Sequence, residues 1–117
     1  MLVLFTLKES VFTLEVRQSQ YQKQFYFAVL INISKVVWTQ GFDNTQLAAQ
    51  KGKAMLKAVC LTSKYLDLSE RNYQKALFAQ EDGELKQAAV FLKRAFFYKQ
   101  RYFVRRDMGL WIEGGRN

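Results

Sequence analysis

The fold is decided by residues 24–48, QFYFAVLINISKVVWTQGFDNTQLA, where the sequence pattern changes from that of strands to that of a helix. Residues 24–33 are apolar on both faces and rich in aromatic and β-branched side chains, which predicts a central strand. Ser34 and Lys35 predict a turn, and residues 36–39 predict the next strand, which ends at Gly41. Connections as short as this one favour antiparallel hairpins.

Two further strands are predicted before this stretch. In residues 11–17, Phe12, Leu14 and Val16 alternate with Val11, Thr13, Glu15 and Arg17, the period of two that is typical of a strand with one buried face. Residues 2–7 predict an additional edge strand. We therefore expect residues 1–42 to form a three- or four-stranded antiparallel sheet.

Helices are predicted after the sheet. The cluster Asp43-Asn44-Thr45 is typical of a helix N-cap, and residues 46–61 follow a helical period. Ser69 is expected to cap a second helix, and Gly83 predicts a bend or a tight turn at its end.

The longest helix is expected from Glu84 to about Met108. The predicted fold class is α+β, in which the sheet packs on a helix and is followed by a C-terminal α-hairpin or a long bent helix. A chain of 117 residues has the usual size of one domain. We expect a sheet part (1–42), a helical part (43–113) and a flexible tail (114–117).

Composition excludes several classes of site. The chain has no histidine, which removes Ser-His-Asp and Cys-His arrangements and the usual histidine-bearing zinc sites. Cys60 is interpreted as a small buried apolar side chain rather than a nucleophile. Glu81, Asp82 and Glu84 are interpreted as carboxylates near a helix start rather than as metal ligands. We expect no cofactor, no metal and no enzymatic activity.

The apolar stretches of the chain are short. Residues 25–31 and 36–38 are well below the roughly 20 residues of a membrane-spanning helix. Residues 1–7 have no preceding basic region and no following cleavage site, unlike a signal peptide. A single cysteine agrees with a reducing compartment. We expect no membrane span and a cytoplasmic or other intracellular location.

Residues 86–106 combine seven cations with no acid. The whole chain carries a formal charge of +8, which favours polyanionic partners. On a helical wheel, five of the cations gather within roughly a third of the circumference, with Lys99 and Arg106 nearer the opposite side. The opposite side is the expected core stripe: Leu85, Ala88, Ala89, Leu92, Ala95, Phe96, Tyr102 and Phe103.

This basic face also contains apolar and aromatic side chains. Cations neutralise phosphates while aromatic rings stack on bases, so the combination indicates a surface for DNA or RNA with weak sequence specificity. The predicted phosphate ligands are Lys86, Lys93, Arg94, Arg101, Arg105 and Arg106, the predicted stacking residues are Phe97 and Tyr98, and Lys53, Lys57 and Lys64 extend the footprint.

Two other interpretations stay open from the sequence. Charged helix faces are commonly just solvated. Val90, Phe97 and Val104, spaced by seven residues, are also typical of a helix–helix seam. In that case the chain forms a homo-oligomer, or it is a structural or adaptor subunit of a larger assembly, such as a phage or ribonucleoprotein particle, whose cationic helix binds an acidic protein.

Residues 37–49, VWTQGFDNTQLAA, resemble part of the plant Apetala/ethylene-response-factor DNA-binding domain and of the arm-binding domains of phage integrases. The resemblance covers residues 11–60 and implies a three-stranded antiparallel sheet on one helix, with the sheet in the DNA major groove. That family contacts DNA with arginines and tryptophans on its first two strands, where this chain offers only Arg17 and Lys23. The residues with an implied structural role are Trp38, Phe42, Asp43, Ala48 and Ala49.

Overall fold

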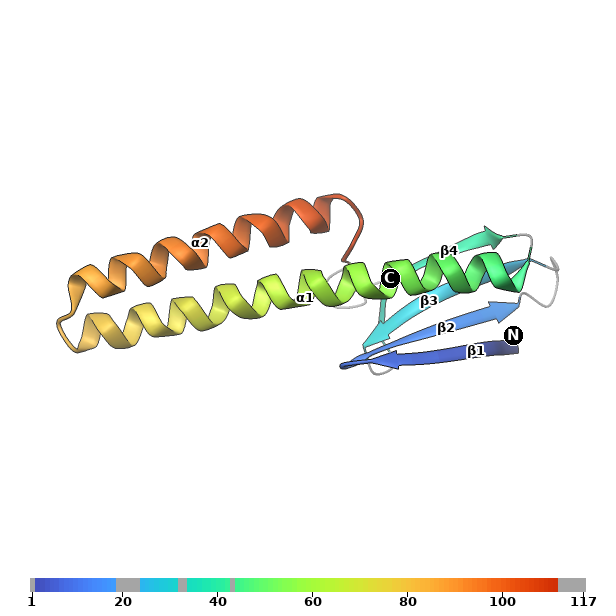
Figure 1. The fold of residues 1–117 in the computed structure, drawn as a ribbon, viewed down its shortest axis with the longest axis horizontal. Coiled ribbons are helices and arrows are strands. Elements are labelled where there is room, and N and C mark those ends of the chain that lie inside the picture. Colours follow the sequence, from blue (N-terminus) through green and yellow to red (C-terminus); the bar gives the residue numbers. More distant parts are fainter. Residues whose placement is uncertain (1, 19–23, 32–33, 43, 112–117) are drawn as a thin grey trace. The chain divides into compact units, whose positions relative to one another are not determined.

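The computed structural model describes residues 2–18, 24–31, 34–42 and 44–111 (Figure 1). Four strands are followed by two helices: β1 (Leu2–Glu9), β2 (Phe12–Gln18), β3 (Phe25–Ile31), β4 (Ser34–Phe42), α1 (Thr45–Glu81) and α2 (Leu85–Asp107). The predicted α+β class is confirmed, and the predicted tail, 114–117, lies outside the described residues. The chain divides into two compact units, unit 1 (Met1–Cys60 with Gly109–Asn117) and unit 2 (Leu61–Met108), and α1 contributes residues to both.

The sheet is a four-stranded antiparallel meander with the order β1-β2-β3-β4. The predicted strands, including the edge strand, are therefore confirmed. The predicted turn at Ser34 and Lys35 is wrong, because Ser34 already pairs with Ile31 and Lys35 with Leu30. β4 is an edge strand, and edge strands readily accommodate polar residues. The polar side chains of Ser34 and Lys35 therefore did not prevent these residues from pairing with β3.

The core of unit 1 lies between β2, β3 and the first part of α1. Alternate residues of β2, Phe12, Leu14 and Val16, are fully buried, as their period of two predicts. Leu56 and Val59, three residues apart on one face of α1, pack into the same cluster. Trp111 packs edge-on against Phe12, with ring centroids 5.8 Å apart.

The start of α1 follows the predicted capping chemistry. The Asn44 side-chain oxygen accepts a hydrogen bond of 2.7 Å from the Leu47 backbone N–H. This bond satisfies one of the amide groups that have no partner within the helix. Asn44 is therefore the residue of the predicted cluster that caps α1, and Asp43 lies outside the described residues.

α1 continues without a break where the sequence predicted a new helix. Ser69 is buried inside α1, and its hydroxyl donates a 2.9 Å hydrogen bond to the Ala95 carbonyl oxygen of α2. The prediction of a cap at Ser69 is therefore wrong. Serine is favoured at helix starts because its hydroxyl forms a hydrogen bond with a nearby backbone group. Here α2 provides that backbone group, the Ala95 carbonyl oxygen.

The predicted turn at Gly83 is confirmed. Gly83 has φ +75°, a left-handed conformation that favours glycine. Its N–H donates to the Gln80 carbonyl oxygen (3.1 Å), and the Glu84 N–H donates to the Ala79 carbonyl oxygen (2.8 Å). These two bonds form a Schellman motif that ends α1. Glu84 is the N-cap residue of α2, whereas Glu81 ends α1.

Figure 1 shows α2 returning antiparallel along the second half of α1, so unit 2 is the predicted α-hairpin. In the described part of the chain, neither helix contains an apolar segment long enough to cross a membrane.

The substitution Leu56→Ala is expected to lower the free energy of unfolding by about 2–5 kcal/mol, because it leaves a cavity in the core of unit 1. Urea denaturation followed by circular dichroism measures this effect. Leu61→Ala is the matched control, because Leu61 is 40% exposed and Leu56 is fully buried. Its expected cost is below about 1 kcal/mol, and equal costs at the two positions would contradict the burial of Leu56.

Candidate nucleic-acid interface

The two helices of unit 2 meet along a narrow stripe of small and polar residues. In the unit 2 part of α1 the buried side chains are Thr62, Ser69, Asn72, Ala76 and Ala79. On α2 only Ala95 and Tyr102 are buried among the residues that belong to the helix. Small side chains let the two backbones approach each other, and no buried side-chain polar atom of the described residues lacks a hydrogen-bond partner.

The predicted core stripe of α2 is therefore partly wrong. Ala95 and Tyr102 are buried as expected, but Leu85 is 68% exposed and Phe96 is 62% exposed. A helix with one helical neighbour buries only the stripe that faces it, which is narrower than the predicted stripe. The apolar residues beside that stripe lie on the surface of the hairpin.

Cations of both helices gather on one side of the hairpin. The Nζ atom of Lys75 on α1 lies 5.7 Å from the ring centroid of Phe91 on α2, and the guanidinium carbon of Arg94 lies 6.0 Å from the same centroid. Lys64 and Arg71 precede Lys75 at spacings of 11 and 4 residues, which places all three on one face of α1.

Further along the same side, α2 contributes aromatic and guanidinium groups. The guanidinium carbon of Arg101 lies 4.9 Å from the ring centroid of Phe97. Phe97 and Arg101 line a groove of about 400 Å³ together with Tyr65 and Arg105. We call this surface the basic edge, and its cations are Lys64, Arg71, Lys75, Arg94, Arg101 and Arg105.

Two predicted site residues also hold the hairpin together. The Nε–H of Arg105 donates a 2.9 Å hydrogen bond to the hydroxyl of Thr62, which is fully buried. Tyr98 is half-buried and stacks on Tyr65, with ring centroids 6.3 Å apart and an angle of 26° between the rings. Tyr98 therefore supports the basic edge from beneath, while Phe97, 51% exposed, is open to a ligand.

The other predicted ligands lie in different places. Lys86 and Lys93 are exposed on the outer face of α2. Arg106 is not part of the basic edge. Its guanidinium carbon lies 4.8 Å from the ring centroid of Phe103, and the guanidinium group pairs with Asp107 at 3.7 Å. Lys53 and Lys57 belong to unit 1, where Lys53 lies over the Phe5 ring at 5.4 Å, so of the three α1 lysines only Lys64 belongs to the hairpin.

Sequence reasoning missed Arg71 and Lys75. The predicted lysine series Lys53, Lys57 and Lys64 continues to these two residues at the same helical spacing. The predicted helix start at Ser69 separates Lys64 from Arg71 and Lys75, whereas the unbroken α1 places the three residues on one face.

The cations of the basic edge have few acids near them. Unit 2 contains ten lysines and arginines and six acids. Within the described residues, no carboxylate forms an ion pair with Lys64, Arg71, Lys75, Arg94 or Arg101. Two exposed acids lie close to this series in sequence: Glu70 directly precedes Arg71, and Asp67 lies three residues after Lys64. Like charges without counter-charges repel one another, so a bound polyanion would stabilise this surface.

The sheet offers a weaker surface for an anion. Arg17, one of the two cations suggested by the resemblance, is already paired with Glu15 through its guanidinium group. Lys23 lies outside the described residues, as do the side chains of Phe27 and Trp38. No group of histidine, cysteine and carboxylate side chains suited to a metal ion occurs among the residues that the structure describes.

No protein-family model, curated protein or solved structure matches this chain. The resemblance to the Apetala/ethylene-response-factor and integrase arm-binding domains therefore stays a prediction from the sequence.

Cys60 is half-buried against the core of unit 1, and its thiol donates a 3.9 Å hydrogen bond to the Glu9 carbonyl oxygen. Burial, and to a smaller extent the Glu9 carboxylate, raise the pKa of the Cys60 thiol. A raised pKa lowers the thiolate fraction at any given pH, which is the opposite of what a nucleophilic cysteine requires.

Alkylation of Cys60 by iodoacetamide near pH 8 is therefore expected to be slower in the folded protein than in the urea-unfolded chain. The difference should shrink as the pH rises through the raised pKa, because both states then hold the thiolate. Mass spectrometry of the alkylated fraction over time measures both rates. Faster alkylation of the folded protein would contradict the raised pKa.

Proposed function

We propose that this protein binds nucleic acid, without catalysis, through the basic edge of its helical hairpin. The observation that supports this most directly is the gathering of cations from both helices around the half-buried ring of Phe91 and beside the exposed ring of Phe97. Lys75 and Arg94 flank Phe91, and Arg101 lies over Phe97. A nucleic acid offers both complements, because its phosphates attract the cations and its bases stack on rings.

Each part of the basic edge has a separate role in this proposal. Arg94 and Arg101 are exposed and can each donate two parallel hydrogen bonds to one phosphate, which a lysine cannot do. The groove beside Phe97 accepts a base against the ring. Tyr65 of α1 and Tyr98 of α2 stack on each other and so hold the two helices together beside this groove.

Phosphate contacts provide affinity without reading the base sequence. The groove contains one amide side chain, Gln100, besides its cations and rings, so few groups can distinguish one base edge from another. We therefore expect weak sequence specificity. The preference between single and double strands depends on whether a base can enter the groove beside Phe97.

The double substitution Arg94→Gln with Arg101→Gln is expected to weaken binding to a labelled oligonucleotide roughly tenfold or more at low salt. The slope of log K against log salt should fall by about 2, because two phosphate contacts are lost. Fluorescence anisotropy over a range of salt concentrations, with single-stranded and duplex DNA and RNA, measures both quantities.

The matched control is Lys8→Gln with Lys51→Gln. This variant removes the same net charge from exposed positions of unit 1. If the control weakens binding as much as the arginine pair, or if wild-type affinity hardly changes with salt, the proposal fails. An equal effect of both pairs would indicate attraction by total charge alone.

A second candidate function is that of a structural or adaptor subunit. It is favoured by the exposed series Val90, Phe97 and Val104, which are 50%, 51% and 59% exposed. Residues spaced by seven form a continuous strip on a helix and are typical of a helix–helix contact. In this alternative the surrounding cations hold an acidic protein instead of a nucleic acid.

The substitution Val90→Ser separates the two functions, because it removes apolar surface from the strip while keeping every cation, Phe97 and the lining of the groove beside it. We expect the affinity for an oligonucleotide to stay within about twofold of the wild type. Competition by poly-L-glutamate at equal charge concentration provides the second measurement. Displacement of the oligonucleotide as effective as that by unlabelled nucleic acid would favour the adaptor function.

A further inference from the structure

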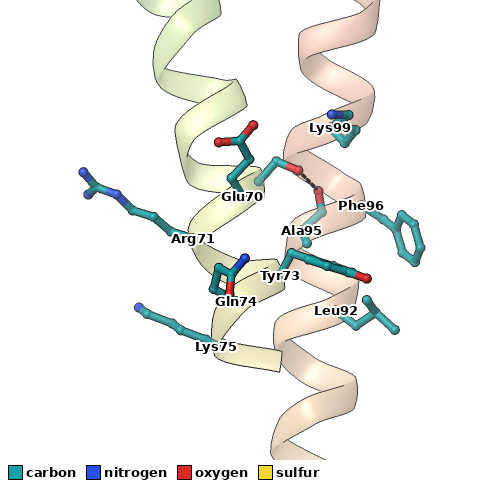
Figure 2. A pocket seen from close by; sticks show the side chains of 10 residues that line it. Glu70, Arg71, Tyr73, Gln74, Lys75, Leu92, Ala95, Phe96 and Lys99 are labelled. Atoms are coloured by element: carbon teal, nitrogen blue, oxygen red, sulfur yellow. Dashed lines mark hydrogen bonds between the residues drawn. The ribbon is translucent and has the colours of Figure 1, made fainter. Parts of the chain in front are cut away.

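The side of the hairpin opposite the basic edge is apolar and exposed. Tyr73 is 49% exposed, Leu92 37% and Phe96 62%. These three side chains line a groove of about 920 Å³ between α1 and α2 (Figure 2). Phe103 (39% exposed) and Leu77 (38% exposed) continue the surface along α2 and α1. We call these five residues the apolar edge.

A continuous apolar surface of this kind is unusual on a monomer in water. Single exposed apolar residues are common, but adjacent large ones on two helices mark a place where another molecule binds. The hairpin alone cannot cover this edge, because each helix has already buried the stripe that faces the other. Two hairpins packed edge to edge would bury it in a four-helix arrangement.

The charges beside the apolar edge indicate what covers it. Glu70 and Lys99 border the groove, one from each helix. Figure 2 shows Arg71 and Lys75, the other charged residues at this groove, extending to the opposite side of α1 from Tyr73. Further along, Arg106 pairs with Asp107. On the side of the groove where Tyr73 lies, the charges of Glu70 and Lys99 therefore balance, whereas Arg71 and Lys75 belong to the basic edge.

This balance suits a second copy of the same chain. In a two-fold symmetric contact each surface meets itself, so Glu70 of one subunit can pair with Lys99 of the other, and the reverse pair forms at the same time. A strongly acidic partner would leave Glu70 opposed by a like charge. An equally basic one would do the same to Lys99.

The competing self-contact, through Val90, Phe97 and Val104, is disfavoured by charge. Lys93 and Arg101 flank that strip, and a second copy would bring four of these cations together. We infer that the protein forms a homodimer through the apolar edges of two hairpins. The dimer would present two basic edges on opposite sides, which increases the avidity for a long polyanion.

Sedimentation velocity in the absence of nucleic acid tests the dimer independently of the proposed function. The wild type is expected to dimerise with rising concentration. Leu92→Ser with Phe96→Ser should raise the dimer dissociation constant roughly tenfold or more, because these side chains lie at the centre of the proposed contact. Val90→Ser with Val104→Ser is the matched control and should dimerise like the wild type.

A charge exchange makes the test specific for contact between two chains. Glu70→Lys and Lys99→Glu should each dimerise more weakly than the wild type, because each places like charges opposite one another. An equimolar mixture of the two variants should dimerise again, since the lysine introduced in one chain then meets the glutamate introduced in the other. Both positions are at the surface of the hairpin, so the helices should be retained in each variant. Circular dichroism is the control measurement for this.

Several results would overturn the inference. The first is a wild type that sediments as a monomer at all concentrations, which would leave the apolar edge to a different protein. Others are a dimer that survives Leu92→Ser with Phe96→Ser, or one that is lost with Val90→Ser and Val104→Ser. Failure of the mixed charge variants to associate would exclude the two-fold pairing of Glu70 with Lys99.

Discussion

Each helix of unit 2 has one helical neighbour, so it can bury only the stripe of side chains that faces that neighbour. The stripe is occupied by Ala76 and Ala79 on α1 and by Ala95 and Tyr102 on α2. Everything beside it stays at the surface. The contact therefore separates the remaining side chains into a basic edge and an apolar edge, and the function of the hairpin depends on that separation.

Polar groups within the stripe keep the two helices in register. The Ser69 hydroxyl donates to the Ala95 carbonyl oxygen, and the Arg105 Nε–H donates to the Thr62 hydroxyl. Buried donors and acceptors cost free energy when they lose their partners, so a shift of one helix along the other is penalised. The same bonds explain why α1 continues through residues that favour helix starts. The hydroxyl groups of Ser69 and Thr62 form hydrogen bonds with α2, so the backbone hydrogen bonds within α1 are not interrupted.

The two edges are suited to different binding partners. On the basic edge, cations from both helices lie beside the rings of Phe91 and Phe97, and like charges there repel a second copy of the chain. On the apolar edge, Glu70 and Lys99 nearly balance, and large side chains stay in water until another surface covers them. A polyanion on one edge and a second hairpin on the other are compatible, because the two surfaces lie on opposite sides of the helix pair.

The sequence by itself determined the buried face of β2 through its period of two, the cap at Asn44, the left-handed turn at Gly83 and the acid-free cationic run of α2, because each depends on neighbours a few residues apart. Only the tertiary structure decided that Lys75 lies beside Phe91 together with Arg94, that Arg106 packs over Phe103, and that Leu92 and Phe96 are exposed. The physical reason is that periodicity places side chains on faces of one helix. Which face is buried depends on the partner helix, and its hydrogen bonds and small residues lie some 26 to 43 positions away in the sequence.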